Sequence, residues 1–166
     1  MSLPEEAAGY VLKKDEGRGI WFLDALLTWK ALAKDTDGQW ELVEQWGPRG
    51  FAAPLHSHHR EAEGFYLLEG AVDFVLGEDR LPAAKGAFMF VPPGTKHSFV
   101  VESDEAKFLT LISPASLEGF FDELGRPAAE VALPPRHDGP PDIERFDRVA
   151  TSYGQQTFGP PPTPRT

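Results

Sequence analysis

Short apolar runs separated by glycine and proline dominate the first two thirds of the chain. Runs of this length between turn-forming residues are typical of β-strands rather than helices. Residues 40–46 alternate with a period of two, because Trp40, Leu42, Glu44 and Trp46 are interleaved with Glu41, Val43 and Gln45. The predicted strands are Tyr10–Lys13, Ile20–Leu23, Leu26–Ala33, Trp40–Trp46, Glu63–Leu68, Val72–Leu76, Ala87–Val91, His97–Val101 and Lys107–Ile112. Asp37-Gly38 predicts a turn, and Glu69-Gly70 predicts a hairpin over residues 63–76.

The pattern becomes helical after residue 112. Ser113-Pro114 has the character of an N-cap and first turn, and Gly125 that of a helix end. Between them, apolar residues recur at helical spacing at Leu117, Phe120, Phe121 and Leu124. A second helical run is formed by Ile143, Phe146, Val149, Ala150 and Tyr153 and ends at Gly154. Residues 126–141, which include His137, predict a proline-rich loop, and the residues from Gly159 onward a mobile tail.

These elements predict one domain without internal repeats. Residues 1–125 would form a β-barrel with N-terminal strands and the first helix, and residues 126–166 would form a loop, a short helix and a tail that pack on the barrel. A chain of 166 residues with 41% hydrophobic residues is long enough to bury a core.

The amino-acid composition favours some cellular compartments and some classes of binding partner over others. The chain has no cysteine, which excludes disulfides and thiolate ligands and favours a cytoplasmic protein. The acidic start does not resemble a signal peptide, and no apolar run approaches the ~18 residues that cross a membrane. The formal charge of −10 disfavours nucleic acid as a partner, because binding phosphates requires a basic face.

Four residues carry the clearest chemistry. His56 and His58 lie two apart, so on a strand their side chains point the same way. Glu63 follows His58 at an odd separation, which predicts a turn or bulge before it, and His97 follows a turn at residues 92–95. Three imidazoles and a carboxylate suit a divalent transition metal: iron, manganese, nickel, cobalt, copper or zinc. Two neighbours are expected to be at the surface, His59 because strand alternation turns it outward and Glu61 because it falls in the turn.

Two motifs around these residues resemble the cupin superfamily. The first, G-x5-H-x-H-x3,4-E-x6-G, is matched by Gly50, His56, His58, Glu63 and Gly70. The second, G-x5-P-x-G-x2-H-x3-N, is matched by Gly86, Pro92, Gly94 and His97, while Val101 replaces the asparagine. The resemblance implies an all-β fold, the cupin double-stranded β-helix or jelly-roll barrel, with the C-terminal α-helices packed outside. It also implies a homodimer, and the N-terminal strands are candidates to extend a partner's sheet.

The helix at 116–124 and the ending at 153–161 are similar to those of bacterial single-domain cupins of the quercetin 2,3-dioxygenase type. This similarity implies cleavage of a flavonol by O₂ with loss of carbon monoxide. Glu63 would then have a catalytic role, as a metal ligand that also accepts the proton of an incoming hydroxyl. The expected substrate pocket contains Phe65 and Phe99, which share strand faces with ligands, and also Phe51, Trp46 and Val101. Phe120 and Phe121 are expected to serve helix packing.

Two other functions fit the same ligands, because cupins host many chemistries on one fold. A metal-dependent isomerase or lyase of a small polar substrate would need a cavity lined by arginine or lysine. A non-catalytic small-molecule-binding module would be stabilised by its ligand without turnover.

Overall fold

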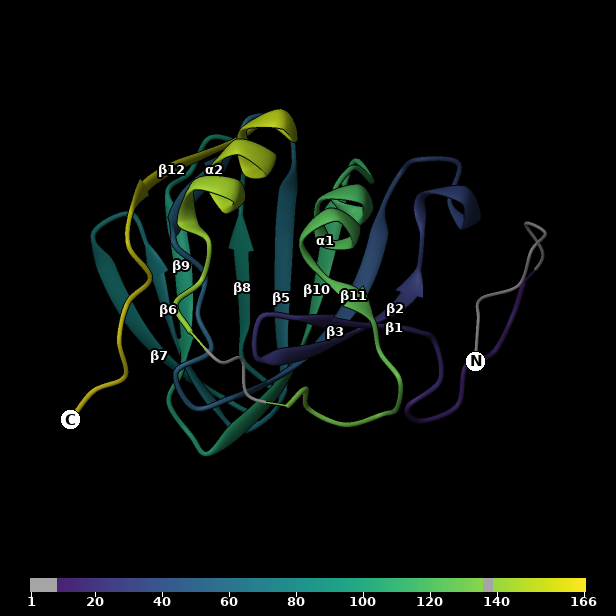
Figure 1. Ribbon diagram of the computed structural model, residues 1–166, viewed down its shortest axis with the longest axis horizontal. Helices are drawn as coiled ribbons and strands as arrows, with labels where there is room; N and C mark the ends of the chain where they lie inside the picture. The colour runs from purple at the N-terminus through teal and green to yellow at the C-terminus, as the bar shows by residue number, and fades with distance from the viewer. Residues whose placement is uncertain (1–8, 136–138) are drawn as a thin grey trace.

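Two antiparallel sheets pack face to face and enclose the core, as the all-β prediction required (Figure 1). The computed structural model describes residues 9–135 and 139–166, so His137 lies outside the described residues. The larger sheet has the strand order β11 (Arg126–Pro127), β1 (Arg18–Phe22), β2 (Ala25–Ala31), β3 (Glu41–Pro48), β10 (Glu105–Ser113), β5 (Ala62–Glu69) and β8 (Phe88–Val91). The smaller sheet has the order β12 (Gln155–Gly159), β4 (Leu55–His58), β9 (His97–Val101), β6 (Ala71–Leu76) and β7 (Asp79–Ala84).

Strand alternation places the core between the sheets. Along β10 every second residue is buried, and along β3 the buried positions are Glu41, Val43, Gln45 and Gly47. Trp29 and Phe108 are the largest fully buried side chains. Gly47 is required in this layer because a Cβ there would lie 2.3 Å from the Phe51 ring. No helix in the described part of the chain is long and apolar enough to cross a membrane.

Several predicted strands differ from the observed ones. Tyr10–Lys13 forms no strand, although the Tyr10 hydroxyl donates to the Lys30 carbonyl at 2.6 Å. The hairpin over residues 63–76 is wrong, because β5 and β6 belong to different sheets and Gly70 sits at the crossing between them. Three of the described strands were not predicted: β7 and β12, at the edges of the smaller sheet, and the two-residue β11, at an edge of the larger sheet. Edge strands tolerate polar residues and proline, so they lack a strong apolar signal.

The first helix, α1 (Glu118–Leu124), starts later than predicted. Ser113 is the last residue of β10, and Leu117 occupies the N-cap without a side-chain bond. A carboxylate from another strand replaces the missing cap: Glu41 Oε1 on β3 accepts the backbone N–H of Leu117 at 2.7 Å and of Ser116 at 3.3 Å. Burial raises the pKa of Glu41, and these N–H donors only partly offset it.

The remaining helices are short. A 3₁₀ turn, η1 (Ala33–Asp35), leads to the predicted turn at Asp37-Gly38, where both residues have positive φ. The second helix, α2 (Ile143–Ser152), matches the predicted span and is capped by Asp142, whose side chain accepts from Arg145 N at 2.9 Å. Both α1 and α2 lie at the same end of the barrel (Figure 1).

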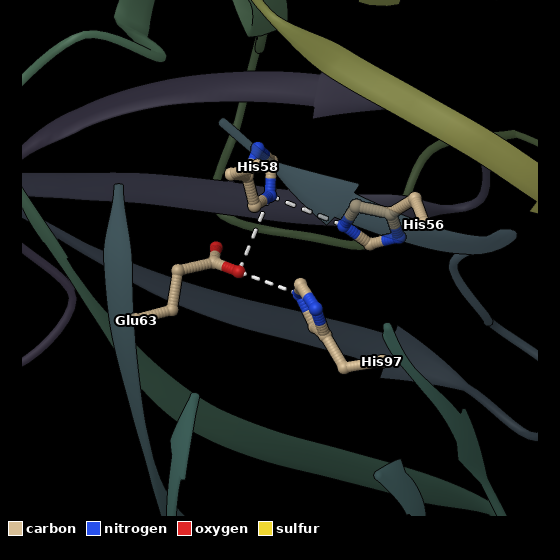
Figure 2. A group of neighbouring side chains, drawn as sticks. All are labelled: His56, His58, Glu63 and His97. Carbon is tan, nitrogen blue, oxygen red and sulfur yellow. Dashed lines mark hydrogen bonds and ion pairs between the residues drawn. The ribbon is translucent and has the colours of Figure 1, made fainter. Parts of the chain in front are cut away.

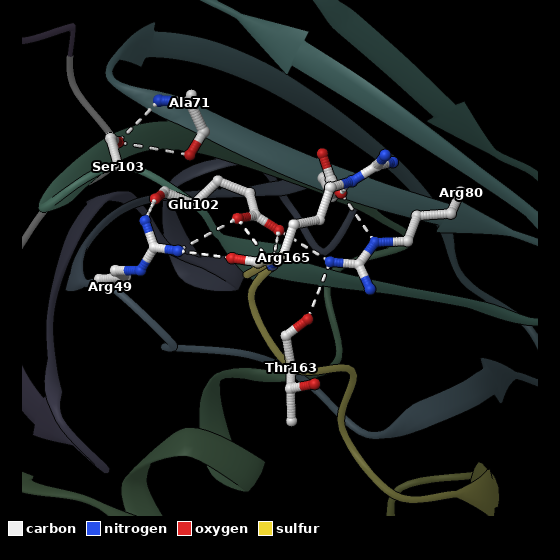
Figure 3. A network of polar contacts seen from close by, with 8 residues as sticks. Arg49, Ala71, Arg80, Glu102, Ser103, Thr163 and Arg165 are labelled. Atoms are coloured by element: carbon white, nitrogen blue, oxygen red, sulfur yellow. Dashed lines mark hydrogen bonds and ion pairs between the residues drawn. The ribbon is translucent and has the colours of Figure 1, made fainter.

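The tail beyond Gly159, expected to be mobile, is anchored to the smaller sheet by a polar network (Figure 3). Arg165 Nε donates to Asp73 Oδ2 at 2.6 Å, and Arg80 Nε donates to the same oxygen at 2.7 Å. Arg80 also donates to the Thr163 carbonyl and to Glu102 Oε1, which accepts the Arg165 N–H. Arg49 Nη2 closes the network by donating to the Arg165 carbonyl at 2.8 Å.

Candidate metal centre

Three strands from both sheets bring the four predicted ligands together (Figure 2). His56 and His58 lie on β4 and His97 on β9, and His56 is directly opposite His97 in the β4–β9 pairing. These strands belong to the smaller sheet, whereas Glu63 lies on β5 of the larger one. All four side chains are buried. The centre therefore bridges the two sheets.

The odd separation between His58 and Glu63 has the predicted structural consequence. The chain bends after β4 and enters the other sheet as β5 at Ala62. His59 and Arg60 are exposed at this bend, as expected for His59. Glu61 was expected at the surface but is only 4% exposed, because its Oε1 accepts the Ser116 hydroxyl at 2.6 Å.

The ligand atoms are close enough for one ion. His56 Nε2 lies 3.1 Å from His58 Nε2, and Glu63 Oε2 lies 3.2 Å from His58 Nε2 and 2.7 Å from His97 Nε2. All four candidate atoms lie within 4.8 Å of one another. Two ligands held about 2.1 Å from one ion at a right angle would be about 3.0 Å apart. The three closest separations are near this value.

The hydrogen bonds on the far sides of the rings support the same interpretation. His56 Nδ1 faces the Pro54 carbonyl at 2.6 Å, and His97 Nδ1 faces the Thr95 carbonyl at 2.9 Å. A carbonyl can only accept, so each Nδ1 carries a proton, which leaves the inward-facing Nε2 as the ring atom available to a metal. This is the usual arrangement around a metal-bound histidine. The residues present therefore fit a divalent metal.

The electrostatics favour positive charge beside Glu63. Burial lowers the pKa of His56 to about 3, assisted by His97 and His58, so this ring is neutral at physiological pH. Burial also opposes ionisation of Glu63, but His58 and His97 outweigh burial and lower its pKa. For His58, the Glu63 carboxylate overcomes burial and raises the pKa. A proton and a metal ion would compete for this position.

A cavity of about 60 Å³ reaches three of the four candidate ligands, His56, His58 and Glu63, and extends to side chains of the helices. Its lining is mainly aromatic and aliphatic, and Glu63 is its only acidic or basic side chain apart from the histidines. The predicted pocket residues Phe51, Phe65 and Phe99 line it. Phe51 and Phe99 pack with ring centroids 5.4 Å apart.

Two predicted pocket residues lie elsewhere. Val101 shares the inward face of β9 with His97 but is fully buried in the core. Trp46 lies on the opposite face of β3 from the buried positions, where its ring contacts the Lys107 ammonium and its N–H donates to Glu105. The alternation along this strand was recognised, but it does not show which of the two faces is turned inward.

Several lining residues were not predicted. Gln45 lies on the inward face of β3, and Gln155 lies on the unpredicted strand β12. The aromatic side of the cavity near the helices is formed by Phe22, Phe120, Phe121 and Phe146. Phe120 and Phe121 do pack the helix, with rings 5.0 Å apart, and they line the cavity as well. The helical spacing of these residues showed a packed face but not what it packs against.

Comparison with known proteins agrees with the fold. Residues 42–112 match the cupin domain family. Quercetin 2,3-dioxygenase of Bacillus subtilis (strain 168) is 34% identical over 147 residues, which cover 89% of this chain but only 42% of that protein. Two solved structures share the fold. A predicted oxalate decarboxylase from Thermotoga maritima has a TM-score of 0.60 and 19% identity, over 63% of this chain and 99% of that chain. An RmlC-like cupin from Shewanella frigidimarina has a TM-score of 0.57 and 20% identity, over 68% of this chain and 96% of that chain. The chain therefore contains a cupin domain at residues 42–112, and its sequence is quercetinase-like.

Proposed function

We propose that this cupin is a metal-dependent dioxygenase of the quercetinase type, which cleaves a flavonol or a related enolic aromatic compound with O₂. The observation that carries the proposal is a cavity of mainly aromatic and aliphatic side chains that reaches His56, His58 and Glu63, three of the four candidate ligands. The 34% identity to a quercetin 2,3-dioxygenase supports it, although the chain spans less than half of that protein.

The charge of the cavity favours this function over the isomerase or lyase. No lysine or arginine is among the described residues that line it, so an acidic or phosphorylated substrate would find no basic partner. A flat, largely neutral aromatic compound suits such a lining.

His56, His58, Glu63 and His97 would hold one divalent metal, which supplies Lewis acidity toward an enolate oxygen of the substrate. His56 and His97 would be kept in orientation by the Pro54 and Thr95 carbonyls, respectively. Glu63 uses Oε2 in its contacts with His58 and His97, and we assign to this carboxylate the acceptance of the proton from the substrate hydroxyl. Phe65 and Phe99 would position the ring and exclude water.

Access to the site requires movement of the side chains that line it. A volume of about 60 Å³ holds a few water molecules, whereas pockets for drug-sized ligands measure about 300 Å³ or more. Leu23 and Phe146 are lining residues from the β1–β2 turn and from α2. We infer that these two side chains shift when a flavonol enters.

The function is tested by aerobic incubation of the protein, loaded separately with each of the six candidate metals, with a panel of flavonols. We expect loss of the flavonol absorption band and release of carbon monoxide with at least one metal. The Glu63→Gln variant should bind metal less tightly and lose turnover. Absence of both substrate loss and carbon monoxide with every metal would exclude the proposed reaction.

We also propose that the chain acts as a cytoplasmic homodimer. The absence of cysteine is consistent with a reducing compartment. A patch of exposed apolar side chains on the outer face of the larger sheet supports association with a second copy; it consists of Tyr66, Phe88, Phe90 and Leu111.

A further inference from the structure

Gln155 places its side-chain amide in the cavity lining, and the structure records no hydrogen bond between this amide and another described residue. Its side chain lines the cavity and the residue is only 5% exposed. The other lining amide, Gln45, differs because its Nε2 donates to Thr110 Oγ1 at 2.9 Å. An amide that faces a cavity and makes no bond to the protein is available to hydrogen-bond a ligand that enters the cavity.

The backbone fixes the position of this amide relative to the candidate metal centre. In the β12–β4 pairing Gln155 is directly opposite His58, so the two side chains leave the same face of the smaller sheet. The His59 N–H donates to the Gly154 carbonyl at 3.1 Å and holds this register. The next residue, Gln156, points the other way and is exposed.

We propose that Gln155 is a substrate-contacting specificity residue, whose amide hydrogen-bonds an oxygen of the substrate next to the oxygen that the metal would hold. This inference rests on the proposed function. An uncharged amide both donates and accepts, which suits a hydroxyl or carbonyl group better than a carboxylate or phosphate. In a lining otherwise composed mainly of apolar side chains, Gln155 selects compounds with two adjacent oxygen functions.

A second role for Gln155 makes a different prediction. His58 Nδ1 is buried and has no partner among the described residues, and it belongs to the residue opposite Gln155. If the amide served to orient His58, its loss would weaken metal binding even without an organic ligand. The structure records no bond between the two groups, whereas Gln155 lines the cavity; this favours the substrate as its partner.

The test compares Gln155→Leu with Gln156→Leu, a matched control on the adjacent outward position. The probes are 2,3-dihydroxynaphthalene and 2-naphthol, which share one ring system and differ by one oxygen. Their Kd values are measured by fluorescence titration of the zinc-loaded proteins. Chelation of the metal by the diol contributes equally in every variant. It therefore cancels when the ratio of the two probes' Kd values is compared between variants.

We expect Gln155→Leu to weaken binding of the diol about tenfold while leaving 2-naphthol unchanged, since one hydrogen bond is lost. Its zinc affinity should equal that of the parent protein, and its Tm should be no lower, because no protein partner loses a bond. Gln156→Leu should match the parent protein throughout.

Three results would overturn the inference: unchanged diol binding in Gln155→Leu, a loss of zinc affinity before any probe is added, or a lower Tm than that of Gln156→Leu. These results are independent of flavonol turnover. Failure of the parent protein to consume flavonols with any metal would count against the proposed reaction, and the naphthalene comparison would still decide the role of Gln155.

Discussion

At the residue scale, adjacent histidines differ sharply in environment. His58 is buried with its Nε2 beside Glu63, while His59 is exposed at the bend that follows. The difference arises because β4 ends at His58, so His59 already belongs to the exposed bend that leads to β5. It also provides a matched pair of substitutions, because one histidine belongs to the candidate centre and the other lies beside it in sequence.

We predict that His58→Ala and His97→Ala each lower the affinity for a divalent metal by at least about 100-fold, since outer partners of ligands alone are worth ten- to 100-fold. His59→Ala should retain the affinity of the parent protein. The measurement is metal content by elemental analysis after dialysis against graded concentrations of chelator. Equal metal retention by His97→Ala and His59→Ala would show that the metal is bound elsewhere.

Sequence reasoning located the ligands because their spacing is constrained by the strands. It was less informative about the cavity. Residue type suggested Trp46 and Val101, but burial of a side chain depends on which face of the strand is covered and how deep in the barrel the residue lies. Glu61 is buried because of a hydroxyl 55 positions away in the sequence, at Ser116. Such long-range partners leave no local signal.

At the element scale, apolar strands were predicted well and the edges of the smaller sheet were not. Strand β7 contains Pro82 and charged residues, and β12 contains two glutamines, so neither has a clear apolar face. The predicted hairpin at Gly70 failed because a turn signal shows that the chain reverses, not that its two arms pair. Here the reversal carries the chain from one sheet to the other.

The start of α1 shows the same limit. A serine followed by proline is a local signal for a cap, but the N–H groups near the helix start are satisfied by Glu41, whose position in the sequence is 76 residues from Leu117. The raised pKa of this buried carboxyl indicates that its charge is costly. A tertiary contact thus replaced the local cap.

The anchored tail makes a prediction about acid stability. The Asp73 side chain is 3% exposed and is bonded by Arg165 and Arg80; burial opposes its ionisation, but these cations outweigh burial and lower its pKa. Because the folded pKa lies below the ordinary value of 3.8, this carboxylate stabilises the fold above that pH. The stabilisation is lost as the pH falls below 3.8 through the folded pKa.

We predict that Asp73→Asn lowers the free energy of unfolding by about 2 kcal/mol at pH 7, less than for a fully buried pair because Arg165 is over half exposed. The difference from the parent protein should persist at pH 5 and shrink below pH 4. Urea denaturation across this range measures it. The exposed Asp79 on β7 gives the control, Asp79→Asn; a deficit of equal size in both variants would refute a specific role for the Asp73 network.

At the scale of the whole molecule, the candidate centre links the two sheets. Three ligands come from the smaller sheet and one from the larger, so a bound metal would hold β4, β9 and β5 together. Binding to the folded state alone raises the free energy of unfolding. The all-β barrel and this convergence followed from the sequence, whereas the size of the cavity and its helical side depend on how α1 and α2 pack over the barrel end.

The outer face of the larger sheet carries the proposed dimer contact. Tyr66 on β5 lies opposite Phe88 on β8, and Gly64 lies opposite both Phe90 on β8 and Leu111 on β10. The four side chains occupy neighbouring positions on three adjacent strands and are 42–64% exposed. They therefore form one continuous apolar patch. Patches of this kind often mark interfaces. A two-fold contact would bury the same residues on both copies.

We predict that the protein elutes as a dimer in size-exclusion chromatography with light scattering. Phe88→Glu and Phe90→Glu should each shift it to a monomer, because the contact would place two like charges close together in an apolar interface. Leu81→Glu is the control, since Leu81 is 48% exposed on β7 of the other sheet. A monomeric parent protein, or a dimer that survives both phenylalanine substitutions, would reject this face as the contact. Circular dichroism of each variant confirms that the mass is measured on folded protein.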